Sequence, residues 1–213
     1  LSRDSRFQQT YNNAFLAVAD GVPLIWASRL LGTPLPERVN GTDLVVALCE
    51  QAEKNHLRLF FLGGRPGAAQ TAAMIMNQRF SRLETIEYYC PSNGFENNQK
   101  LADEVIDRVR RARPDLLFVG LGAPKQEYWM EQNCKRVGVP LSIGIGGSFE
   151  LIAGILPRAP RWVQRCGLEW LFRLFIEPKR LWKRYLVGNA VFVWLVLTQL
   201  ASQQWARSVQ NRG

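Results

Sequence analysis

Short apolar segments that alternate with helical patterns constrain the fold of this 213-residue chain most strongly. Apolar strands that are each followed by a helix are typical of a parallel sheet covered by helices on both faces. The sequence therefore predicts an α/β, Rossmann-like, mostly parallel sheet with helices on both faces in residues 1–156. The expected strands are residues 57–62, 83–89, 115–121 and 141–145, and the helices between them are expected to end at Phe80, Ala112 and Val137.

The chain before the first strand contains helical and turn signals. Residues 15–20 are mostly apolar and lead into an Asp-Gly turn, so a short helix or a buried strand is expected there. Residues 23–31 and 41–55 are predicted to be helices, the second with Thr42 or Asp43 as its N-cap.

Three loops follow predicted strands and contain glycines that allow a ligand to approach the backbone. They are residues 63–67, 122–127 and 146–148. Because ligands bind at the carboxyl ends of the strands in open α/β sheets, we expect these loops to form one binding rim. The glycines assigned to it are Gly63, Gly122, Gly146 and Gly147.

The loop Gly-Ala-Pro-Lys-Gln-Glu at 122–127 carries the most specific signal on this rim. Pro124 suits a first helical turn, whose free amide groups attract phosphate. Lys125 adds positive charge, and Gln126 and Glu127 are suited to pair with amide edges or sugar hydroxyls. An ordinary strand–helix loop with a capping glutamate is the alternative interpretation.

Common cofactor and metal motifs are absent from the sequence. Residues 120–125 and 144–149 begin like dinucleotide fingerprints but lack the third small residue, and no P-loop sequence occurs. The four cysteines are scattered, the chain has one histidine, and no Asp-x-Asp pair is found. We therefore expect neither a cofactor nor a metal, and any bound diphosphate must meet cationic side chains and helix N-termini.

Asp20 is the candidate general base. It follows an apolar run and precedes a glycine, so the turn presents a carboxylate beside apolar surface. Such surroundings raise the proton affinity of a carboxylate, which suits it to accept a proton during catalysis. The alternative is an aspartate that only shapes the turn.

The segment 158–185 concentrates positive charge among aromatic residues. It holds eight Lys or Arg and two Glu in a chain with a formal net charge of +9. A nucleotide diphosphate, a lipid phosphate surface or a nucleic acid would fit such a face, although no nucleic-acid reading motif accompanies it. Helical patterns alone continue from here, with one helix expected over residues 162–175 and another from Pro178 onward, so residues 157–213 are predicted to be a helical, basic appendage. Its apolar part, 186–200, is short of the ~20 residues that span a bilayer, which favours an interfacial helix.

Seven blocks of the sequence closely resemble the WecG/TagA/CpsF glycosyltransferases. The resemblance runs in order from Asp20 to Leu186. Its blocks are DGVP at 20–23, PLPERVNGTD at 34–43, GAPKQE at 122–127, GIGGSFELIAG at 144–154, RAPRW at 158–162, GLEWLFRL at 167–174 and EPKRLWKRYL at 177–186.

This resemblance implies an inverting, metal-independent transfer of a sugar from a UDP-sugar to an undecaprenyl-diphosphate-linked saccharide. Donors in the family carry N-acetylmannosamine, its uronic acid or glucose, and the products are bacterial surface polysaccharides. The resemblance also implies a peripheral enzyme at the cytoplasmic face of the inner membrane, held to anionic lipid by its C-terminal helices.

The resemblance further assigns roles to individual residues. It makes Asp20 the base, lets Arg38 hold substrate and places Gln126 near the nucleotide or sugar. Arg173, Arg180 and Arg184 are the best matches to arginines that meet the diphosphate. The full set of expected substrate-binding residues is Arg38, Thr42, Asp43, Gly63, Gly122, Pro124, Lys125, Gln126, Glu127, Gly146, Gly147, Arg173, Arg180 and Arg184.

The first residues depart from the family pattern, in which a Thr-x-Asn segment precedes the Asp-Gly motif. Either Thr10, Asn12 or Asn13 takes its place, or the segment is shortened or missing. The rival interpretation of the whole chain is a non-catalytic module that binds membranes or polyanions. The sequence leaves the donor sugar and the oligomeric state open.

Overall fold

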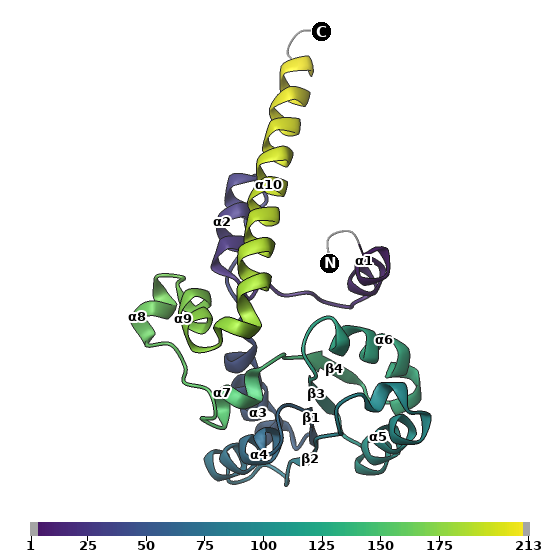
Figure 1. The fold of residues 1–213 in the computed structure, drawn as a ribbon. Helices are drawn as coiled ribbons and strands as arrows, with labels where there is room; N and C mark the ends of the chain where they lie inside the picture. Colours follow the sequence, from purple (N-terminus) through teal and green to yellow (C-terminus); the bar gives the residue numbers. More distant parts are fainter. Residues whose placement is uncertain (1–3, 211–213) are drawn as a thin grey trace. The chain divides into compact units, whose positions relative to one another are not determined.

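The computed structural model describes residues 4–210, apart from the side chains at 184, 204 and 206–210. Contacts group the chain into two compact units, whose elements are labelled in Figure 1. The α/β unit consists of the residues up to Ala17 together with Gly41–Pro157. The helical unit consists of Val18–Asn40 and the residues from Arg158 onward. Residues 18–40, which the sequence placed in the first domain, therefore group with the C-terminal helices.

The α/β unit contains the predicted parallel sheet. Within the described residues its strands lie in the order β2-β1-β3-β4, and every neighbouring pair is parallel. The prediction of the fold class is thus confirmed, although the second strand is shorter than expected because residues 83–86 lie outside it. The strands are β1 (Leu59–Gly63), β2 (Glu87–Tyr89), β3 (Leu116–Gly120) and β4 (Leu141–Gly144).

Helices cover both faces of this sheet because alternate strand residues point to opposite sides. On one face Phe61 meets Phe118 edge-on at 5.5 Å and stacks on Phe149 at 4.7 Å between ring centroids. On the opposite face of the sheet, Phe60 and Leu117 belong to a second cluster of buried apolar side chains. The first face is covered by α3 (Gly41–Asn55), α4 (Ala68–Arg79) and α7 (Ser148–Ile152), and the second by η1 (Phe95–Asn97), α5 (Gln99–Ala112) and α6 (Lys125–Val137).

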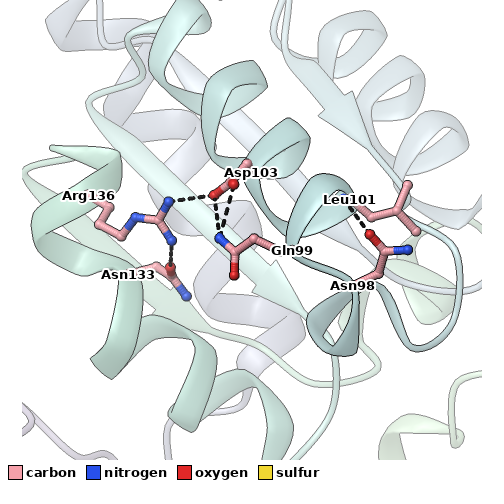
Figure 2. A network of polar contacts seen from close by, with 6 residues as sticks. All are labelled: Asn98, Gln99, Leu101, Asp103, Asn133 and Arg136. Carbon is pink, nitrogen blue, oxygen red and sulfur yellow. Dashed lines mark hydrogen bonds and ion pairs between the residues drawn. The ribbon is translucent and has the colours of Figure 1, made fainter.

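A polar network links α5 to α6 on the outside of the second layer (Figure 2). Arg136 donates to Asp103 at 2.6 Å and to Asn133 at 3.4 Å, and Gln99 donates to the same aspartate at 3.0 Å. Asn98 accepts from the Leu101 amide and so caps the start of α5. These contacts hold two covering helices together.

The N-terminal segment differs from the prediction. Residues 5–12 form a helix, α1 (Ser5–Asn12). This helix is fixed to α6 by Tyr128, whose hydroxyl donates to Asp4 at 2.7 Å. Residues 15–20 are neither helix nor strand, and Phe15 is fully exposed. The expectation of a short helix or buried strand there is wrong, because Phe15, Leu16 and Val18 are exposed and do not pack in an apolar layer of the described residues.

The helical unit consists of α2 (Val22–Leu30), α8 (Arg161–Arg165), α9 (Glu169–Ile176) and α10 (Pro178–Gln210). The sequence predicted one helix over 162–175, and this prediction is wrong. The chain breaks at Gly167, whose φ is +73° and whose position leaves no room for a Cβ, since that atom would lie 2.9 Å from the Val22 side chain. The start of α2 therefore packs where the helix would have continued.

The long helix α10 leaves its apolar side chains exposed. Examples are Leu186, Val187, Trp194 and Leu197, which are 59–63% exposed. By length and composition alone, residues 178–203 could cross a membrane, with a mean hydropathy of 1.5 and none of the window buried. The prediction that this region is too short to span a bilayer considers only the apolar residues 186–200. The helix extends beyond them in both directions, so the candidate span is longer. Length does not decide between crossing a bilayer and lying in its interface.

Candidate functional site

Asp20 is held in the helical unit by the segment that follows α2. The Val39 amide donates to the Ala19 carbonyl at 2.9 Å, so the residues on either side of α2 run beside each other. This pairing brings the Asn40 side chain to Asp20, where Nδ2 donates to Oδ1 at 3.1 Å. Asp20 thus has a defined position while keeping access to solvent.

Three charged side chains surround this carboxylate. Arg38 comes from the segment next to Asp20, and its Nη2 lies 3.4 Å from Oε2 of Glu169. Glu169 and Arg173 stand one turn apart on α9 and so share a face of that helix. All three act electrostatically on Asp20. The structure therefore brings the predicted base together with two of the predicted arginines, and it adds a second carboxylate.

The surroundings raise the pKa of Asp20 above its ordinary value. Burial is the largest cause, since nearby protein displaces water from the ionised carboxylate, and Glu169 adds to it by like-charge repulsion. The guanidinium groups of Arg38 and Arg173 and the hydrogen bond from Asn40 act in the opposite direction. A carboxylate with raised proton affinity and solvent access is suited to accept a proton from a bound hydroxyl.

Two further predicted arginines lie on α10. Arg180 donates to Glu177 at 2.6 Å, and its side chain is about half exposed. It is not one of the main groups that shift the pKa of Asp20. The side chain of Arg184 lies outside the described residues, so its predicted role stays a prediction.

The rim of the α/β unit is built tightly at the ends of β1 and β3. The Gly64 amide donates to the Gly120 carbonyl at 2.9 Å. Gly63 has a φ of +96°, and a Cβ there would come within 3.1 Å of the Gly120 backbone. The glycine predicted at position 63 is thus required by the close approach of two backbones, and the same approach shapes the floor of the rim.

Gln126 joins two of the predicted loops. It is buried, accepts from the Gly146 amide at 3.0 Å, and donates to Glu127 at 2.9 Å. Gly144 leaves space for it, since a Cβ there would lie 2.7 Å from Gln126 Nε2. Both ends of this amide form hydrogen bonds within the protein, so Gln126 links the two loops, and its predicted place near the nucleotide or sugar stays a prediction.

Other residues of the 122–127 loop are placed around the start of α6. Pro124 is the N-cap rather than a residue of the first helical turn, and Gly122 takes a φ of +77°. Lys125 forms an ion pair with Glu96 at 2.8 Å and lies over the Phe95 ring. The positive charge expected from Lys125 is therefore partly balanced by a neighbouring carboxylate.

The third loop and the start of α3 lie together. A Cβ at Gly41 would meet Oγ of Ser148 at 3.0 Å, so α3 begins against the loop that precedes α7. Thr42 and Asp43 stand in this first turn, with Thr42 buried. Among the predicted glycines of this loop, Gly146 has a φ of +56° and Gly147 is the N-cap of α7.

Glu150 is a candidate that the sequence reasoning missed. It lies in the first turn of α7, is 5% exposed, and accepts from the Arg65 amide at 2.9 Å through Oε1. Its Oε2 is buried and has no hydrogen-bond partner within the described part of the chain, and the same holds for Oε2 of Glu127. A buried carboxylate oxygen without a donor is costly, so each is suited to accept from a ligand. Local sequence gave no such signal, because a glutamate in a first helical turn usually faces solvent.

The polar residues near the N-terminus bind within the α/β unit. Thr10 donates to Glu131 at 2.7 Å and Asn13 to the same carboxylate at 3.3 Å. These contacts fix α1 to α6. The alternative in which Thr10 or Asn13 supplies a pocket residue gains no support from this geometry.

The described residues contain no group of three or more His, Cys, Asp or Glu side chains that could hold a metal ion. The four cysteines are free. The expectation of a reaction without a metal stays a prediction.

Comparison with known proteins identifies relatives along most of the chain. Residues 1–206 match the model of the glycosyl transferase WecG/TagA/CpsF family. An N-acetylglucosaminyldiphosphoundecaprenol N-acetyl-beta-D-mannosaminyltransferase of Bacillus spizizenii is 31% identical over 184 residues, which is 86% of this chain and 69% of the relative. A protein of the same name from Staphylococcus aureus is 32% identical over 82% of this chain and 66% of its own length. The matched region thus spans about two thirds of these relatives.

Proposed function

Because the chain belongs to the WecG/TagA/CpsF family of glycosyltransferases, we propose that it transfers an N-acetylmannosamine-type sugar from a UDP-sugar to undecaprenyl-diphosphate-linked N-acetylglucosamine. The names of the two relatives supply the acceptor and the sugar. The observation that carries the proposal in this chain is the Asp20 cluster, which combines a carboxylate of raised proton affinity with two guanidinium groups. The product would serve the synthesis of a bacterial surface polysaccharide.

Asp20 is the proposed general base. Its carboxylate takes the proton from an acceptor hydroxyl, and the resulting oxygen attacks the anomeric carbon from the side opposite UDP. The bond between that carbon and the diphosphate breaks as the new bond forms, so the configuration at the anomeric carbon inverts. Base assistance of this kind contributes about 10²–10⁴ in rate.

Cationic groups are proposed to stabilise the departing diphosphate. Arg173 stands on the α9 face that Glu169 shares, and Arg38 keeps one ion pair of 3.4 Å without an aligned hydrogen bond. A guanidinium group has five donors, so Arg38 retains the capacity to bind phosphate oxygens. We propose that these two arginines take the part that a metal plays in many enzymes acting on nucleotide sugars.

The rim of the α/β unit is proposed to bind the nucleoside. Glu150 is suited to accept from a ribose hydroxyl or a ring N–H, because its buried Oε2 lacks a donor within the described residues. Glu127 offers a second such oxygen, and Gln126 keeps it in place. Two acceptors of this kind favour the uncharged part of a nucleotide over its phosphates, which a carboxylate would repel.

The helical unit is proposed to contact the membrane that carries the acceptor. The exposed apolar side chains of α10 follow a basic first part, where Lys179, Arg180 and Lys183 occur. Basic residues beside an apolar helix are attracted to anionic lipid of the cytoplasmic leaflet. A location at the cytoplasmic face of the bacterial inner membrane follows from this proposal.

The proposal is tested by measuring UDP release from a panel of UDP-sugars, each with and without a soluble prenyl-diphosphate-N-acetylglucosamine analogue. A chelator in parallel reactions tests whether a divalent metal is needed. We expect release from UDP-N-acetylmannosamine that depends on the acceptor and persists with the chelator. Vesicle binding without acceptor-dependent release from any donor would instead favour a non-catalytic membrane-binding module.

A further inference from the structure

Glu169 has no role in the function proposed so far, although it stands beside the proposed base. It belongs to the first turn of α9 and is 8% exposed. An acidic residue in a first helical turn stabilises the helix by facing its positive end, and such residues are usually solvated. Burial of this carboxylate therefore calls for a reason beyond helix stability.

The contacts of Glu169 connect it with Arg38. Oε2 lies 3.4 Å from Arg38 Nη2, and the two side chains are 11% and 20% exposed. This oxygen has no aligned hydrogen bond within the described part of the chain. Glu169 thus attracts Arg38 by charge, while the N–H donors of the Arg38 guanidinium group stay able to bind other acceptors.

The groups that face Asp20 come from two segments of the helical unit. The segment after α2 provides Asn40, which donates to Asp20, and Arg38. Helix α9 provides Glu169 and Arg173. Two guanidinium groups favour the ionised form of Asp20, and Glu169 is the charged neighbour that opposes them.

We propose that Glu169 is a positioning residue for the transfer reaction, which holds Arg38 beside Asp20 and places a second carboxylate next to the proposed base. The proposal rests on the proposed function, in which Asp20 is the general base. If the negative charge of Glu169 is removed while Arg38 stays in place, burial alone opposes the two guanidinium groups, so the proton affinity of Asp20 falls and it becomes a weaker base. A weaker base contributes less to proton transfer in the transition state.

The direct test is a titration of the Asp20 carboxyl group by ¹³C NMR, assigned with the Asp20→Asn variant. It compares the full chain with Glu169→Gln, which removes the charge and keeps the shape. We expect the midpoint of Asp20 to move to lower pH in Glu169→Gln. The control is Glu177→Gln on the same unit, because Glu177 pairs with Arg180 and is not one of the main groups that shift the pKa of Asp20. This control should leave the midpoint in place.

An unchanged midpoint in a folded Glu169→Gln variant would overturn the proposal. If that variant does not fold, Glu169→Asp keeps the charge and withdraws the carboxylate by one methylene group. A smaller move of the midpoint to lower pH is then expected, and no move would overturn the proposal. Neither titration depends on transfer activity.

The pH dependence of transfer separates this inference from the proposed function. In Glu169→Gln the acid limb of kcat/KM should move to lower pH with the Asp20 midpoint, and the plateau of kcat should fall about three- to tenfold. Glu169→Asp should recover part of both. A moved midpoint together with an unmoved acid limb would show that Asp20 is not the base, which overturns the catalytic role of Glu169 although the two carboxylates are coupled.

Discussion

The two units of this protein treat their apolar side chains in opposite ways. In the α/β unit Phe60, Phe61 and Phe118 are at most 2% exposed and lie between a sheet and its covering helices. In the helical unit Phe175 and Trp194 are 76% and 63% exposed. Buried aromatic groups stabilise the unit that contains them, whereas exposed ones can bind another apolar surface. The difference shows that the first unit has a buried aromatic core, and it agrees with the proposal that the second unit meets a membrane.

The largest effect on activity is expected from Asp20→Asn in the helical unit. Turnover should fall by about 10²–10⁴, because the amide cannot accept the proton. The pKa of Asp20 is higher in the folded protein than in the unfolded chain, so the protonated carboxyl group favours folding relative to the ionised one. This contribution to stability is complete below the unfolded-state pKa and is lost as the pH rises through the folded-state pKa. The variant should therefore unfold at neutral pH no more easily than the wild type. Normal turnover, or a marked loss of stability, would contradict the assignment.

The largest effect on stability is expected from a core residue of the α/β unit. Phe118→Ala should lower the free energy of unfolding by about 3–5 kcal/mol, since it leaves a cavity under the covering helices. The matched variant Phe175→Ala should change it by less than about 0.5 kcal/mol. Urea denaturation measures both. Equal losses would remove the contrast between the two units.

Membrane binding is expected to depend on the basic start of α10. Reversing the charges of Lys179 and Lys183 to Glu should weaken binding to anionic vesicles by at least about tenfold. Reversal of Lys100 on α5, in the α/β unit, is the control and should leave binding intact. Flotation at low and high salt measures the effect, and binding that resists both the salt and the substitutions would show that charge is not the cause.

Two glycine-to-alanine substitutions, one in each unit, should change stability in opposite directions. Gly144→Ala should lower the free energy of unfolding by about 1–3 kcal/mol, because the new Cβ would strike Gln126. Gly188→Ala lies in the middle of α10 with nothing near the new Cβ, so it should favour the helix by about 0.5–1 kcal/mol. Thermal unfolding and helicity by circular dichroism measure both. The same sign at both sites would contradict the packing described for Gly144.

Local patterns were sufficient to predict most of the α/β unit. Apolar strands and amphipathic helices are properties of short segments, and the sheet they predicted is parallel as expected. Long-range contacts were not predictable in this way. The break at Gly167 depends on Val22, which lies far away in sequence, and the pairing of Val39 with Ala19 places residues 18–40 in the helical unit.

The candidate site shows the same division. Asp20 and Arg38 were found from an apolar-flanked turn and a resemblance, and the structure brings them together with Arg173. Glu150 and Glu169 were missed, because each resembles an ordinary acidic residue in a first helical turn. Only tertiary packing buries them, and burial is what makes their carboxylates chemically informative.

Equilibrium binding of UDP, measured beside turnover for Asp20→Asn and Glu150→Gln, tests the central claim most directly. The claim is that the helical unit supplies the base and the rim of the α/β unit holds the nucleoside. Asp20→Asn should lose turnover and bind UDP with unchanged affinity, while Glu150→Gln should bind UDP more weakly. The account would be contradicted if Glu150→Gln bound UDP as tightly as the wild type, or if Asp20→Asn kept its turnover.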